Sequence, residues 1–311
     1  MNNYSEIPKL PEKLDEDSRK ILLEFIALSK NLSKQQIEEI RLGLEENVDV
    51  SIYANPKFSD RQMKQIRKGK ENGVDVAYYL NPKFNSRQMK EIRLGLQNGV
   101  DVSVYAKGEF DAHQMENIRI GLEEHLNVNV YANPKFSGYQ MGIIIMGLEQ
   151  GVDVNIYAKT DFSGDQMNEI LQGLLKEIDV SIYAMPNFSS HQMRQIRKGQ
   201  ERKVDVRIYA KREFDAHQME EIRLGLEAGV DVSTYASQEF SSEQMEAIRI
   251  GQEEGIDVSV YAKPDIPYQY MKQILEDLKA GINVNSYVKP KISWENKEKI
   301  RTLIVNIRKI L

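Results

Sequence analysis

The stretch FSDRQMKQIRKGKENGVDVAYYLNPK, residues 58–83, recurs along the chain at a fixed interval. Its first residue returns every 26 residues, at Phe58, Phe84, Phe110, Phe136, Phe162, Phe188, Phe214 and Phe240. Leu32 stands one interval before Phe58, and Ile266 and Ile292 continue the register after Phe240. The chain therefore holds ten full units and part of an eleventh, without an insertion. A repeat of this length predicts a solenoid, in which each unit buries its apolar face against its neighbours.

The composition fits one elongated soluble domain. Of the 311 residues, 41% are hydrophobic and 29% are charged, which suffices for a continuous core under a solvated surface. The net charge of −5 disfavours general nucleic-acid binding, which needs a basic face. There is no cysteine for disulfides or for thiolate metal ligation. Because no run of about 18 apolar residues and no apolar signal core is present, we expect a soluble, cytoplasmic protein without membrane contact.

The repeat divides the chain into three segments. Residues 32–291 are the ten units. Residues 1–31 begin with a polar lead-in and then carry Ile21, Leu22 and Phe25 at helical spacing, which predicts an N-terminal capping helix. Residues 292–311 keep the register but lose the motif, as a C-terminal capping helix would.

The first half of each unit is typical of an α-helix. Positions are counted from the first residue of a unit, so Phe58 is position 1. Position 2 is Ser, Asp or Asn in nine of the ten units and position 5 is Gln in nine, which is the pattern of a capping box. The helix should run from position 3 to about position 14. Its periodicity predicts a packed face at positions 5, 6, 9, 10, 12 and 13, and a solvated face at positions 3, 4, 7, 8, 11, 14 and 15.

Three constant residue types in the unit have structural interpretations. Gly at position 12 costs about 1 kcal/mol relative to Ala inside a helix, so we expect a neighbouring backbone to approach closely there. Tyr at position 22 occurs in all ten units and is interpreted as a buried ring whose hydroxyl finds one partner. Stacking of bases or aromatic ligands on this row is the alternative. Arg at position 10 occurs in seven full units and is expected to pair with the Asp at position 18.

The second half of the unit, VDVSIYANPK at residues 48–57, permits two interpretations. Val, Ile and Tyr favour a strand, which would give an α/β leucine-rich-repeat-like solenoid. In-register parallel strands would, however, stack the position-18 Asp residues of successive units on one another, which is destabilising. An Asp N-cap on a short helix removes that conflict. We therefore expect an all-α solenoid of stacked helix pairs, long then short, with the leucine-rich-repeat-like solenoid as the alternative.

The consensus FSxxQMxxIRxGLExGVDVSxYAxP is matched most fully by FSSEQMEAIRIGQEEGIDVSVYAKPD at residues 240–265. It resembles a tandem helical repeat common in proteins of clostridia-like bacteria, and the resemblance covers residues 32–291. It implies a bacterial helical-repeat protein. No catalytic role is established for that repeat, so no functional residue is carried across.

Motifs that carry enzyme chemistry are absent from the sequence. There is no HExxH, no Walker-type phosphate loop, no GxSxG and no GxGxxG in a βαβ context. Three of the four histidines share position 4 of their units, without a thiolate or carboxylate partner at ligand spacing. We expect no catalytic residue, no cofactor and no metal site.

Function is sought where units depart from the consensus. Units five and six carry large apolar residues at positions that are polar in most units, which predicts an exposed apolar patch for a partner or for self-association. Its residues are Tyr139, Ile143, Ile145, Met146, Leu171 and Leu175.

Two further rows are candidates. Position 21 would form an apolar groove for a peptide if the short helices line one side of the solenoid, although core burial explains it equally well. Its residues are Ile52, Val104, Val130, Ile156, Ile182, Ile208 and Val260. Unit seven is strongly basic, which predicts a patch for an acidic partner or phosphate, with a solvated basic face as the alternative. That patch consists of Arg194, Lys198, Arg202, Lys203 and Arg207.

The sequence therefore predicts a non-catalytic scaffold that binds a protein or peptide through the solenoid surface. A homo-oligomer is compatible with the apolar patch. The alternative is a nucleic-acid-binding helical repeat protein, but the polar positions vary in sign from unit to unit, and nucleic acid is disfavoured.

Overall fold

The computed structural model describes residues 31–288 and 292–310, and every regular element within these ranges is helical. The long helices are α2 (Lys34–Glu45), α3 (Asp60–Glu71), α4 (Ser86–Gln97), α5 (Ala112–Glu123), α6 (Gly138–Glu149), α7 (Gly164–Leu175), α8 (Ser190–Glu201), α9 (Ala216–Ala228), α10 (Ser242–Glu253), α11 (Tyr268–Lys279) and α12 (Trp294–Ile310). Between them lie 3-10 helices: η1 (Val50–Ile52), η2 (Val76–Tyr78), η3 (Val102–Val104), η4 (Val128–Val130), η5 (Val154–Ile156), η6 (Val180–Ile182), η7 (Val206–Ile208), η8 (Val232–Thr234), η9 (Val258–Val260) and η10 (Val284–Ser286).

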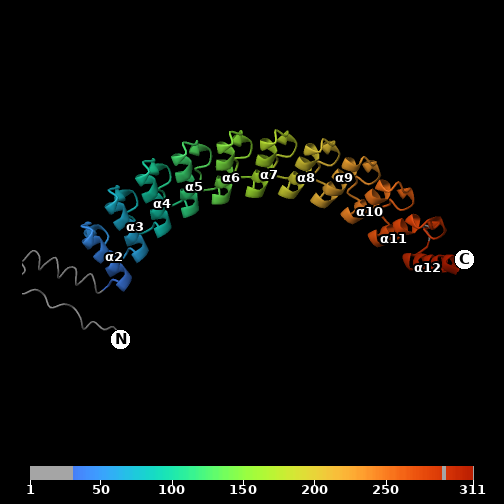
Figure 1. Ribbon diagram of the computed structural model, residues 1–311, viewed down its shortest axis with the longest axis horizontal. Coiled ribbons are helices and arrows are strands. Elements are labelled where there is room, and N and C mark those ends of the chain that lie inside the picture. The colour runs from blue at the N-terminus through green and yellow to red at the C-terminus, as the bar shows by residue number, and fades with distance from the viewer. Residues whose placement is uncertain (1–30, 289–291, 311) are drawn as a thin grey trace, which may run out of the picture. The chain divides into compact units, whose positions relative to one another are not determined.

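By its contacts the chain divides into two compact parts, and the boundary between Ile145 and Met146 falls inside α6. In the N-terminal part, α2 to α5 pack each on the next, and in the C-terminal part α7 to α11 do the same. Within each part the long helices lie side by side in chain order, each followed by its short helix (Figure 1). The predicted all-α solenoid of helix pairs is confirmed. The leucine-rich-repeat-like alternative is wrong for residues 31–288 and 292–310, which contain no strand.

The capping box starts the long helix and also joins neighbouring units. Gln62 N donates to Ser59 Oγ at 3.3 Å, and Ser59 N donates to Gln62 Oε1 at 2.8 Å, as the sequence predicts. The amide of Gln62 makes one more hydrogen bond, since its Nε2 donates to the backbone oxygen of Phe84 in the next unit at 2.6 Å. The same bond recurs from Gln36, Gln88, Gln114, Gln166, Gln192, Gln218 and Gln244. One side chain therefore fixes a helix start and the register of the following unit.

The second half of the unit is a single 3-10 turn with an Asp cap. Asp49 accepts a hydrogen bond from Ser51 N at 3.0 Å, and Asp75 accepts one from Ala77 N at 3.0 Å. Short polar side chains at a cap satisfy backbone donors that the turn itself leaves unpaired. The strand propensity of Val and Ile is overridden because the Asp cap and the buried Tyr that follows fix the chain in a turn.

A buried tyrosine explains the constant glycine. Tyr79 is fully buried, and its hydroxyl donates to the backbone oxygen of Gln65 at 3.2 Å within the same unit. A Cβ atom on Gly69 would overlap this hydroxyl oxygen and lie 2.9 Å from Val76 Cγ1. The interpretation of the tyrosine row as buried rings is confirmed. The expectation of a neighbouring backbone at position 12 is wrong, because the glycine faces the short helix of its own unit.

The ends of the repeat array are described only in part. The predicted lead-in and capping helix at residues 1–31 lies outside the described residues, except for residue 31. At the other end α12 occupies the predicted C-terminal segment, and Arg301 Nη2 donates to Asp277 Oδ1 of α11 at 2.8 Å. Asp277 replaces the usual glycine at position 12, and the Tyr287 hydroxyl donates to its Oδ2 at 2.5 Å. On α12 the side chains of Leu303 and Ile307 are 63% and 56% exposed.

Candidate binding surfaces

A polar seam runs between successive long helices. The side chain at position 8 of one unit accepts a hydrogen bond from the Nε of the arginine at position 10 of the next unit. The pairs are Glu39–Arg67, Gln65–Arg93 and Glu91–Arg119 in the N-terminal part, and Glu169–Arg197, Gln195–Arg223 and Glu221–Arg249 in the C-terminal part. Their distances lie between 2.8 and 3.1 Å. Most of these arginines also pair with a Glu four residues later on their own helix, as Arg119 does with Glu123 at 2.8 Å.

The seam keeps its arginines charged although they are largely buried. Burial alone would lower the pKa of Arg67, but hydrogen bonds to Glu39 and Glu71 outweigh it, and the net shift is upward. Glu221 shows the opposite balance, since burial raises its pKa and the hydrogen bond from Arg249 offsets this only in part. A buried pair of this kind is costly to break, about 3–5 kcal/mol, because one charge is left without its partner. The six seam arginines therefore have a structural role in joining neighbouring units.

The predicted partner of the arginines is wrong. The position-18 Asp residues stay on their own turn, where each accepts from a backbone N–H, as Asp101 does from Ser103 N at 3.0 Å. The arginine side chains instead cross the seam to position 8. The helix periodicity assigned position 8 to the solvated face. The structure instead buries or half-buries the residues at this position.

Half of the predicted apolar patch lies inside the fold. Ile143 occupies position 8, and Ile145 and Leu171 occupy position 10, the two positions that carry the Glu–Arg pairs in other units. Their exposures are only 3%, 6% and 0%. The prediction that they form an exposed surface is wrong: position 8 was assigned to the solvated face although it is buried or half-buried in every unit, and position 10 belongs to the packed face that the helix periodicity predicts.

The other half of that patch is exposed. Tyr139 in the N-terminal part is 61% exposed, and Met146 and Leu175 in the C-terminal part are 47% and 40% exposed. A binding role for these three side chains stays a prediction.

The seven predicted residues of the position-21 row are half-buried: Ile52, Val104 and Val130 in the N-terminal part, and Ile156, Ile182, Ile208 and Val260 in the C-terminal part. Tyr78, at the same position in unit two, is 48% exposed. Thr234 holds the same position in unit eight, and its hydroxyl oxygen lies 3.1 Å from Gln252 Nε2, at position 13 of the next unit. The row is therefore partly covered by the following helix. Its role as a peptide groove stays a prediction.

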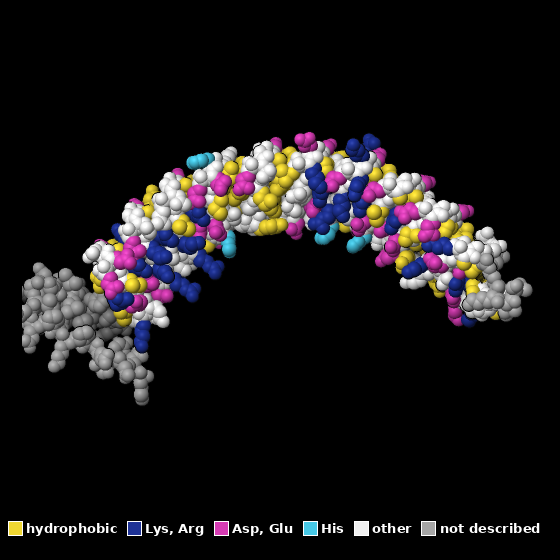
Figure 2. Space-filling view, in the orientation of Figure 1, with side chains coloured by type: hydrophobic (Ala, Val, Ile, Leu, Met, Phe, Trp, Pro, Cys, Tyr) yellow, Lys and Arg dark blue, Asp and Glu magenta, His cyan; other side chains and the backbone are white. Residues whose placement is uncertain are grey.

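The basic patch of unit seven is partly neutralised. Arg194 Nε donates to Glu169 at 2.8 Å, and Arg207 Nε donates to Asp205 at 2.8 Å. The remaining members are Lys198, which is half-buried, and Arg202 and Lys203, which are exposed at the end of α8. Dark blue side chains gather over α8 in Figure 2. Two of the five predicted residues therefore already hold a carboxylate of this chain.

A basic surface that the sequence reasoning missed lies on α3 and α4. It consists of Arg61, Lys64 and Lys68 on α3 and of Arg87 and Lys90 on α4, and Figure 2 shows Lys and Arg side chains gathered over these helices. The three α3 residues are spaced i, i+3 and i+7, which places them on one helix face. The spacing of these residues can be seen in the sequence. The surface was missed because charge was considered for each unit separately, whereas the surface is shared by two units. It is called the α3–α4 basic surface below.

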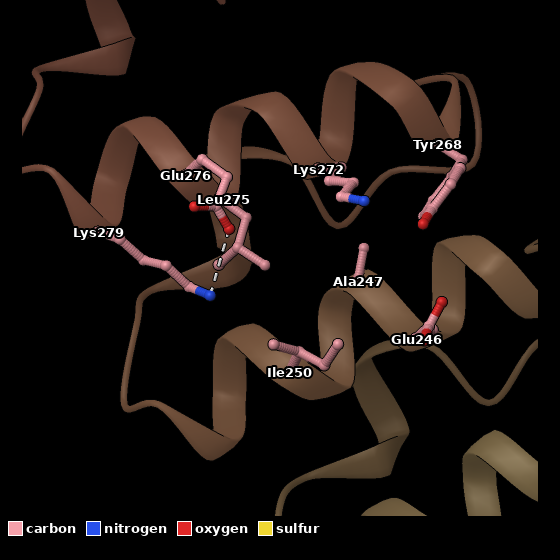
Figure 3. A pocket seen from close by; sticks show the side chains of 8 residues that line it. All are labelled: Glu246, Ala247, Ile250, Tyr268, Lys272, Leu275, Glu276 and Lys279. Atoms are coloured by element: carbon pink, nitrogen blue, oxygen red, sulfur yellow. Dashed lines mark ion pairs between the residues drawn. The ribbon is translucent and has the colours of Figure 1, made fainter.

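A small cleft opens between α10 and α11, where the seam lacks its polar pair. Ala247 and Leu275 stand where most seams carry Glu or Gln and Arg. They and Ile250 line a cleft of about 130 Å³. Figure 3 shows the Tyr268 hydroxyl and the Lys272 amino group directed toward one another above Ala247. Cofactor and drug-sized sites usually need about 300–1,000 Å³, so this cleft is the size of a side-chain pocket.

Residues 31–288 and 292–310 contain no group of three or more His, Asp or Glu side chains that could hold a metal ion. None of the helices in these ranges is long and apolar enough to cross a membrane.

Comparisons of the chain with protein-family models, with curated proteins and with solved structures return no match. The resemblance to the clostridia-like helical repeat therefore stays a prediction that rests on the repeat consensus alone.

Proposed function

We propose that this chain is a non-catalytic scaffold that binds a polypeptide partner through the exposed positions of its long helices. The observation that supports the proposal is that constant and variable positions of the unit have different surroundings. Gln at position 5, Gly at position 12, Tyr at position 22 and Arg at position 10 are all occupied by contacts inside the fold. Position 4 is exposed and position 7 is exposed or half-buried, and their chemistry changes from helix to helix, from Arg61 and Lys64 on α3 to Glu243 and Glu246 on α10.

A regular stack with variable outer positions is the form in which repeat proteins present extended binding surfaces. The proposal includes the cytoplasmic location and the bacterial repeat family expected from the sequence. Cell fractionation of the source organism tests the location.

Selection from a random peptide display library tests the binding proposal. The bait is the full-length folded chain, and the counter-selection bait is the same chain held unfolded in urea. We expect enrichment of peptides that bind the folded chain in a saturable way. The nucleic-acid alternative is tested beside it with a pool of random single-stranded oligonucleotides. No enriched peptide, together with salt-sensitive retention of the oligonucleotides, would overturn the proposal.

A further inference from the structure

The α3–α4 basic surface carries more positive charge than its surroundings neutralise. Residues 58–98 hold nine Lys and Arg against four Asp and Glu, a local net charge of +5 in a chain whose net charge is −5. The structure explains where two of these four carboxylates, Glu71 and Glu91, go. Glu39 and Glu71 both pair with Arg67 in the seam, and Glu91 pairs with Arg119 and with Lys90.

The outer cations of this surface are consequently left open to a partner. Among the residues that the structure describes, no carboxylate lies within ion-pair distance of Arg61, Lys64, Lys68 or Arg87. Arg61, Lys64 and Arg87 are exposed, and Lys68 is half-buried. An anionic partner would therefore meet cations that do not first have to give up an ion pair within this chain.

The surface is bounded on both sides. On α2 the position-7 residue is Glu38, which pairs with Arg41, and on α5 it is Glu116, which lies 3.7 Å from His113. The basic surface is thus two helices wide, and a long polyanion that continued past it would meet carboxylates. Such a limit disfavours a nucleic-acid backbone, which neutralises many cations in series along an extended track.

We propose that the α3–α4 basic surface docks a short acidic segment of a polypeptide in an extended conformation. Neighbouring packed helices lie about 8–10 Å apart. In the extended polyproline II conformation, with three residues per turn, residues three apart lie on the same side of the chain and are separated by about 9 Å, so carboxylates at that spacing reach α3 and α4 together. This inference rests on the proposed function and names the chemistry of the partner.

The test uses a fluorescein-labelled peptide of repeated Glu-Gly-Gly and the full-length chain. The matched probe is repeated Gln-Gly-Gly, which has the same length and flexibility without the charges. Anisotropy at low salt should show saturable binding of the Glu peptide, no binding of the Gln peptide, and loss of binding at high salt because exposed charges are screened.

The site is tested with two charge-matched variants. Arg61→Glu with Lys64→Glu reverses charge on α3, and the fold should accept it because α10 carries Glu243 and Glu246 at the same two positions. Lys198→Glu with Arg202→Glu makes the same change in charge on α8. The α3 variant loses two exposed ion pairs with the peptide and gains two repulsions, so its binding should be weakened about tenfold or more. Binding by the α8 variant should change less than about twofold. Circular dichroism checks that both variants keep their helices.

The outcomes separate this inference from the proposed function. Equal weakening by the α3 and α8 variants would mean that the peptide responds to overall charge, which overturns the α3–α4 surface as the site. Tighter binding of a single-stranded oligonucleotide than of the Glu peptide, lost in the α3 variant, would overturn the polypeptide assignment. If display selection enriches only peptides that still bind the α3 variant, the scaffold function holds and this inference fails.

Discussion

The packing of Tyr209 against Gly199 allows a prediction whose sign is opposite to that of an ordinary helix. Replacement of a glycine by alanine inside an exposed helix stabilises it by about 1 kcal/mol. At Gly199 of α8 the new Cβ atom would overlap the hydroxyl oxygen of Tyr209 and lie 2.9 Å from Val206 Cγ1. The Tyr209 hydroxyl donates to the backbone oxygen of Gln195 at 3.1 Å, and its ring is fully buried.

Gly199→Ala must therefore displace a buried ring. Overpacking of a core costs about 1–3 kcal/mol, and loss of the tyrosine hydrogen bond adds about 1 kcal/mol. The gain in helix propensity offsets about 1 kcal/mol of this. We expect a net destabilisation of about 1–3 kcal/mol, the sum of these terms.

Urea unfolding followed by circular dichroism measures the midpoint, and native-state hydrogen exchange reports α8 itself, because long repeat arrays need not unfold in one step. The control is Gly142→Ala in α6, where the nearest atom to the new Cβ would be Asn117 Oδ1 at 4.0 Å. That variant should be neutral or stabilised by up to about 1 kcal/mol. Tyr209→Phe removes the overlapping oxygen, so the double variant with Gly199→Ala should lose less stability than the sum of the single changes. A stabilised Gly199→Ala, or strictly additive effects in the double variant, would refute the packing argument.

Three further predictions concern the seam and the buried ionisable groups. Leu275→Arg combined with Ala247→Glu rebuilds the missing seam pair. In urea unfolding, the double variant should be more stable than the sum of the two single changes in unfolding free energy predicts, by at least about 1 kcal/mol. Additive changes would count against the seam. Burial raises the pKa of Tyr53 from 10.0 to about 12, so its stabilising contribution is complete below pH 10 and is lost as the pH rises toward 12. In a variant whose five tyrosines outside position 22 are replaced by Phe, absorbance at the tyrosinate band should therefore rise together with loss of the helical signal, and ionisation of this row in a fully helical protein would contradict its burial. Burial alone would raise the pKa of Asp277, but hydrogen bonds, including the one from Arg301, bring the net pKa below its ordinary value of 3.8. The attachment of α12 to α11 should therefore hold above pH 3.8 and weaken as the pH falls further. Hydrogen exchange of α12 should accelerate in acid in the native chain, and an Asp277→Asn variant that shows the same acid response would disprove this origin.

Local signals in the sequence were sufficient for the elements of the fold. The capping box of Ser59 and Gln62 marks where a long helix begins, and the Asp N-cap distinguishes a short helix from a strand. These features depend on residues a few positions apart, whose interactions follow from backbone geometry. The interpretation of the position-22 tyrosines as buried rings also followed from their size and their single polar atom.

The contacts between units could not be predicted in the same way. Ile143 and Leu171 were placed outside because the residues at their positions are usually polar, whereas the seam buries polar and apolar residues alike. A polar residue is buried without great cost when its partner comes from the next unit, 28 residues away in the case of Glu39 and Arg67. Periodicity within one helix carries no information about such a partner. The α3–α4 basic surface was missed for a related reason, since it forms only when two helices are placed side by side.

The central claim is that the constant residues of the unit hold the stack and that the outward residues bind the partner. A saturation scan of residues 58–83, read out for protease resistance and for binding of the Glu-Gly-Gly peptide in the same cells, tests it most directly. We predict that substitutions at Gln62, Arg67, Gly69 and Tyr79 lower both signals, whereas those at Arg61 and Lys64 lower binding and leave protease resistance unchanged. Binding that follows protease resistance at every position, Arg61 and Lys64 included, would contradict the claim.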